Sequence, residues 1–111
     1  MKAKKYNKLV RDKIPEICLR NGAIPEIRIA KNDSEYRFYL QKKILEEALE
    51  IEKETDINKL KKEIVDLIEV INYLIKAANI NEKEIEKIRK EKKRNRGGFN
   101  KRVILLKIKQ K

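Results

Sequence analysis

Residues 43–71 read KILEEALEIEKETDINKLKKEIVDLIEVI, and this stretch decides the fold that we expect. It contains two helical patterns separated by a short TD break. The first pattern places Glu47 and Glu50 at i and i+3, and the second does the same with Glu63 and Asp66, so each acidic pair shares one helix face. If the two helices fold back on each other, the four carboxylates converge.

Converging carboxylates call for a cation, because like charges repel and raise one another's pKa. A hard divalent ion that prefers oxygen ligands, Mg2+ first, is the simplest neutraliser. The acids also lie within or beside apolar rows: Glu47, for example, shares a row with Leu40, Ile44 and Ile51. A merely solvated surface does not require this placement. A helix surface whose acids simply face solvent remains the alternative explanation, since 43% of the chain is charged.

The composition predicts one domain over residues 1–111 and excludes several chemistries. The chain has no His, which rules out a Ser-His-Asp triad, a Cys-His dyad and a His-ligated zinc site. A single Cys18 excludes an internal disulfide and fits a reducing compartment. No apolar run approaches the ~20 residues that span a bilayer, and the N-terminus lacks the apolar core of a signal peptide. We therefore expect a cytoplasmic protein that does not bind membranes.

A formal net charge of +12 predicts an anionic partner, and a nucleic acid, a nucleotide polyphosphate and an anionic membrane all qualify on charge alone. Basic residues gather before a short helix that contains Pro15, where backbone N–H groups favour an anion, and again around the Gly97-Gly98 turn. Solvent-exposed charge with no bound anion is the more common explanation for both groups. The candidates for contacting phosphate are Lys8, Arg11, Lys13, Arg94, Arg96 and Lys101.

The remaining patterns predict a mainly all-α protein. Long helices are expected over about residues 35–54, from about residue 57 to 78, and over about residues 82–94. Two alternating stretches, Ile24–Ala30 and Arg102–Lys109, predict a short accessory strand pair. The second long helix is apolar on two sides, so it must pack against more than its neighbour in sequence. We expect an oligomeric bundle, a homodimer or a homotetramer.

Three separated stretches together resemble a known family: YNKLVRDKIPEI at residues 6–17, the ExxE and ExxD pairs, and RGGFNKRVIL at residues 96–105. In order and content they are similar to the MazG-like, all-α nucleoside triphosphate pyrophosphohydrolases. They are most similar to the small subgroup that opens with a KLVRDKIPE-type motif, to which phosphoribosyl-ATP pyrophosphohydrolases are related. The resemblance covers nearly the whole chain.

This resemblance implies a MazG-like helical bundle with a nucleotide substrate, cleaved between its α and β phosphates into a nucleoside monophosphate and pyrophosphate. Non-canonical nucleotides or a phosphoribosyl-ATP-like molecule are the substrates it suggests. The family's Mg2+ ligands correspond to Glu47, Glu50, Glu63 and Asp66, and Glu46 would orient or deprotonate the attacking water. One departure is Lys62, which stands where relatives often carry another acid. It would either remove an acid from the outer shell of the metal or place a cation next to a phosphate.

Two other functions stay open on the sequence. A small basic nucleic-acid-binding module fits the net charge and the basic stretch 87–102, although these basic residues are not interleaved with aromatics. A non-catalytic helical dimer fits the apolar patterns and predicts that Glu50→Gln and Asp66→Asn leave every function intact.

Overall fold

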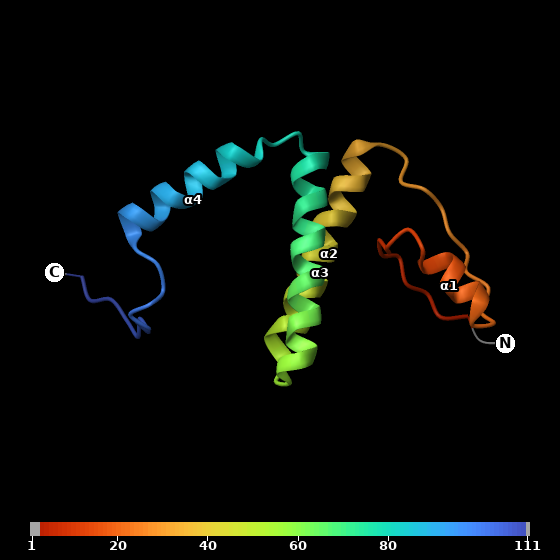
Figure 1. Ribbon diagram of the computed structural model, residues 1–111, viewed down its shortest axis with the longest axis horizontal. Coiled ribbons are helices and arrows are strands. Elements are labelled where there is room, and N and C mark those ends of the chain that lie inside the picture. Colours follow the sequence, from red (N-terminus) through yellow and green to blue (C-terminus); the bar gives the residue numbers. More distant parts are fainter. Residues whose placement is uncertain (1–2, 111) are drawn as a thin grey trace. The chain divides into compact units, whose positions relative to one another are not determined.

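The computed structural model describes residues 3–110, which form four helices and no strand (Figure 1). The chain divides into two compact units, Met1–Asn79 and Ile80–Lys111. The first unit contains α1 (Ile14–Arg20), α2 (Asp33–Lys53) and α3 (Ile57–Ala77), and the second contains α4 (Glu82–Arg96). The mainly all-α prediction is therefore confirmed.

The first unit is built on a hairpin of the two long helices, α2 and α3, which lie side by side (Figure 1). Their starts are fixed by side-chain caps: Asn32 accepts a hydrogen bond from the Glu35 N–H at 2.9 Å, and Asp56 accepts one from the Lys59 N–H at 3.0 Å. Each cap satisfies a backbone donor that the first helical turn leaves free. The predicted break at Thr55-Asp56 lies in the turn, residues 54–56, that folds α3 back along α2.

The contact between α2 and α3 uses only part of their apolar surface. Leu40 of α2 is 2% exposed, and it is the one fully buried apolar side chain among residues 3–110. On α3, Leu60, Leu67 and Leu74 are half-buried, whereas Ile64 and Ile71 of the same heptad pattern are exposed. The apolar stripe of α3 is therefore wider than the surface that α2 covers.

The segment before the hairpin contains the short helix α1. Lys13 is its N-cap and makes no side-chain capping bond, and Pro15 stands in the first turn, where its missing N–H costs nothing. The helix ends at the Asn21-Gly22 turn, in which Gly22 adopts φ +84° and the Ala23 N–H donates to the Cys18 carbonyl at 2.9 Å. A glycine suits this position because it tolerates a positive φ.

The second unit consists of α4 and an extended tail. The Asn81 side chain caps α4 by accepting a hydrogen bond from the Lys83 N–H at 2.8 Å. The helix stops at Gly97, which has φ +82° and whose N–H donates to the Lys93 carbonyl at 2.8 Å. Apart from Glu91, which is half-buried, the residues of α4 are exposed.

The predicted accessory strand pair does not form. Residues 23–30 and 102–110 form no helix and join no ladder, and they belong to different units. Arg102, where the second stretch begins, has φ +58°, which lies outside the range of a strand. Their apolar side chains lie in solvent, as Ile24 at 85% exposed and Leu106 at 87% exposed illustrate. Alternation alone was a poor guide here because an isolated two-stranded ribbon is only marginally stable and needs a further strand or a helix to pack against.

None of the helices in residues 3–110 combines the length and the apolar character that crossing a bilayer demands.

Candidate metal centre

Three of the four predicted acidic ligands meet on the α2–α3 hairpin. Glu47 from α2 and Glu63 and Asp66 from α3 each offer a carboxylate oxygen, and these three oxygens all lie within 4.8 Å of one another. Glu47 is buried, and the two acids on α3 are half-buried. The i, i+3 spacing on α3 and the fold of the hairpin together produce this acidic cluster.

Burial is the main reason why the pKa of Glu47 is raised above its ordinary value. Lys43, whose Nζ lies 3.6 Å from a Glu47 carboxylate oxygen, opposes the shift. The charges of Asp66, Glu46 and Glu63 add to it. Glu47 therefore carries an unfavourable negative charge, which a cation in the cluster would stabilise.

Glu50, the fourth predicted ligand, stands outside this cluster. Its carboxylate lies 3.2 Å from the Nζ of Lys53 one turn later on α2, and its side chain is 42% exposed. The structure thus assembles Glu47, Glu63 and Asp66 and pairs Glu50 with a lysine.

Glu46 lies beside the cluster and is surrounded by lysines. It accepts hydrogen bonds from Lys8 at 3.0 Å and from Lys43 at 3.3 Å. Burial would raise its pKa, but the two lysines outweigh burial and leave the pKa below the ordinary value. Glu46 is therefore held in its ionised form.

Arg11 reaches the cluster from the N-terminal segment. Its Nη2 donates to Asp66 Oδ1 at 2.8 Å, and its Nη1 donates to Glu69 Oε2 at 3.2 Å. Together with Lys8, it brings the segment that precedes α1 onto the acidic face of the hairpin. Glu69 was not among the predicted site residues, although its position three residues after Asp66 continues the row that begins at Glu63.

The other predicted phosphate-binding residues occupy different places. Lys13 is exposed at the start of α1. Arg94 and Arg96 lie in the last turn of α4, and Lys101 lies in the turn that follows, so all three belong to the second unit. Lys62, in contrast, lines an open hollow on α3 with Lys61, Val65 and Asp66, which places a lysine at the edge of the cluster.

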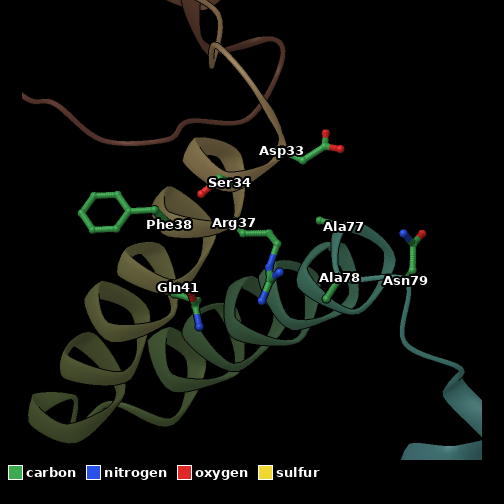
Figure 2. Close-up of a pocket in the computed structure, with 8 residues that line it drawn as sticks. All are labelled: Asp33, Ser34, Arg37, Phe38, Gln41, Ala77, Ala78 and Asn79. Atoms are coloured by element: carbon green, nitrogen blue, oxygen red, sulfur yellow. The ribbon is translucent and has the colours of Figure 1, made fainter.

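A second hollow lies elsewhere on the hairpin, where the first turns of α2 meet the end of α3 (Figure 2). In the close-up, Arg37 extends from α2 toward the end of α3, and Phe38 points away from it. None of the predicted site residues lines this hollow. The lining residues are Asp33, Ser34, Arg37, Phe38, Gln41, Ala77, Ala78 and Asn79.

The acidic cluster fits a hard divalent cation. It offers only carboxylate oxygens, the ligand type that Mg2+ and Ca2+ prefer over the nitrogen and sulfur ligands of zinc. A cation in the cluster would favour the charged carboxylate of Glu47 and so oppose the rise of its pKa that burial causes.

Replacing Glu47 by glutamine is expected to stabilise the protein when divalent metal is removed. Because the folded-state pKa of Glu47 is raised, its charge destabilises the fold at neutral pH, and this cost disappears as the pH falls below the ordinary value of 4.5. Urea unfolding in EDTA should show a higher free energy of unfolding for the variant at pH 7, by on the order of 1 kcal/mol, and no gain near pH 3.5.

The control for this prediction is Glu52→Gln, which removes an exposed acid from the same helix and should change little at either pH. A Glu47→Gln protein that is less stable than wild type at pH 7 would mean that the contact with Lys43 outweighs the cost of burial.

Comparison with known proteins identified no matching family model, no matching curated protein and no matching solved structure.

Proposed function

We propose that this protein is a Mg2+-dependent nucleotide pyrophosphohydrolase of the MazG-like kind, which cleaves between the α and β phosphates. The observation that supports this most strongly is the cluster of Glu47, Glu63 and Asp66, with Arg11 in contact with one of its members. Acids that bind a divalent cation and bases that bind phosphate are the two components that phosphoanhydride hydrolysis requires.

The three clustered carboxylates would hold the cation, and Glu50 would join them only after leaving Lys53. When bound, Mg2+ supplies charge stabilisation at phosphate oxygens and makes water more acidic. Lys8 contacts Glu46, Arg11 contacts Asp66, and Lys62 lines the hollow beside Asp66. These bases would offset the rest of the polyphosphate charge.

We expect Glu46 to orient the attacking water molecule rather than to remove a proton from it. Its lowered pKa makes it a weak base, since a carboxylate that binds protons poorly also abstracts them poorly. Its two lysine contacts fix the position of the carboxylate, which is what an orienting acceptor needs.

The direct test is pyrophosphate release from a panel of canonical and modified nucleoside triphosphates and phosphoribosyl-ATP, with Mg2+ and with EDTA. We expect at least one of these substrates to release pyrophosphate only when Mg2+ is present. We also expect added Mg2+ to raise the melting temperature of the protein. No release across the panel and no Mg2+ effect on melting would reject the enzyme and favour the small basic nucleic-acid-binding module.

The proposed oligomer is a homodimer that covers the exposed apolar side of α3. Ile64, Ile68 and Ile71 are 41%, 53% and 37% exposed, and burying such side chains is the main driving force of association. Sedimentation should show a dimer for the wild type, and Ile68→Lys should shift it to monomer. Asn58→Lys, which introduces the same charge at an exposed polar position of α3, should remain dimeric.

A second candidate function is nucleic-acid binding by the second unit. The basic residues along α4 are exposed, and Phe99 after its end is 97% exposed, so phosphate contacts and base stacking are both accessible. Affinity for single-stranded RNA or DNA that falls steeply with salt and does not depend on Mg2+ would support this function. This affinity would be lost if the charges of Arg94 and Arg96 were reversed.

A further inference from the structure

Arg11 connects two carboxylates that differ in their relation to the acidic cluster. Asp66 belongs to the cluster, whereas Glu69 stands one turn further along α3 and outside it. The guanidinium uses a separate nitrogen for each, at 2.8 Å from Asp66 and 3.2 Å from Glu69. Arg11 thus occupies Oδ1 of Asp66, and its positive charge would repel a divalent cation that binds the same carboxylate.

The contact between Arg11 and Asp66 is suited to exchange. The two side chains are 52% and 39% exposed, so water and ions reach the pair. Ion pairs of this kind add little to stability and break without unfolding the protein. The carboxylate of Glu69 is a second partner for Arg11 and lies outside the acidic cluster. It would keep the guanidinium nearby when Asp66 binds a divalent cation.

We propose that Arg11 is a displaceable counter-ion of Asp66 that couples the binding of the divalent cation to the binding of phosphate. A cation that arrives alone must displace Arg11, which weakens its binding. A cation that arrives with a pyrophosphate group binds more tightly, because the released guanidinium has two phosphate oxygens to contact. Glu69 acts as a positioning residue that holds Arg11 beside the cluster. This inference rests on the proposed function, because it requires the cluster to bind a divalent cation.

This coupling predicts effects of opposite sign in one variant. Arg11→Gln should bind Mg2+ alone about three- to fivefold more tightly than wild type, because a competing charge is gone. The same variant should bind inorganic pyrophosphate at saturating Mg2+ about tenfold more weakly, because a charge-assisted pair of hydrogen bonds is lost. A folding defect would weaken both affinities and cannot produce this pattern.

The experiment is isothermal titration calorimetry of the metal-free full-length protein, with Mg2+ alone and then with pyrophosphate at fixed saturating Mg2+. The variants are Arg11→Gln, Glu69→Gln and Arg20→Gln, the last being a control that removes an equal charge from the exposed end of α1. We expect opposite shifts in Arg11→Gln, a smaller loss of pyrophosphate affinity in Glu69→Gln, and no change in Arg20→Gln.

Three results would overturn the proposal, and they differ in what they leave standing. Mg2+ affinities that are equal in wild type and Arg11→Gln would remove the counter-ion role while the metal site remains. A weaker Mg2+ affinity in Arg11→Gln would mean that Arg11 orders the acids instead of competing for them. If the wild type binds no Mg2+ with or without pyrophosphate, the proposed function fails together with this inference.

Discussion

Replacing Asp66 by asparagine is expected to lower the rate of Mg2+-dependent pyrophosphate release by about 100-fold or more, since the cation contributes several kcal/mol of transition-state stabilisation. Asp66 is the member of the cluster that both offers an oxygen near Glu47 and Glu63 and contacts Arg11. An amide keeps the shape of the side chain but removes its charge. The measurement is the initial rate of pyrophosphate release with the best substrate of the panel.

The matched control is Glu52→Gln, an exposed acid on α2 whose loss should leave the rate within about twofold of wild type. Melting temperatures in EDTA separate loss of chemistry from loss of fold: the Asp66→Asn protein should melt close to wild type without metal and gain little when Mg2+ is added. An Asp66→Asn enzyme with normal rates would place the metal site elsewhere and would remove the main support for the proposed function.

Replacing Leu40 by alanine is expected to lower the free energy of unfolding by about 2–5 kcal/mol. The truncation leaves a cavity, and the small core has few other buried side chains that could fill it. At 2% exposed, Leu40 is the only apolar side chain in residues 3–110 with full burial. Such a loss is a large share of the stability of a small domain. The measurement is urea unfolding followed by circular dichroism, with the midpoint compared between variants.

Leu19→Ala provides the control, because Leu19 is also helical but is 60% exposed on α1, so the same truncation should cost at most about 0.5 kcal/mol. Similar small losses for both variants would show that the contact between α2 and α3 is not centred on Leu40. Similar large losses would show that Leu19 is buried in an assembly.

The acidic cluster shows how far the sequence could predict the candidate site. The i, i+3 pairs placed Glu63 and Asp66 on one face of α3. The sequence also placed Glu47 in an apolar row, and the structure shows that this acid is buried. The same spacing on α2 also predicted Glu50, but the structure pairs Glu50 with Lys53. Helical spacing fixes which residues share a face, whereas the rotamer of a half-exposed side chain depends on the charges near it.

Local interactions within a few residues set the helices of this protein and most of their ends, since Asn32, Asp56 and Asn81 cap the long helices and the turns at Gly22 and Gly97 end α1 and α4. Which distant groups meet depends on tertiary packing. The contact of Arg11 with Asp66 and Glu69 spans more than fifty residues, and the alternating stretches 24–30 and 102–109 stay unpaired. Both outcomes depend on packing between segments that are far apart in the chain, and a local pattern carries no information about such packing.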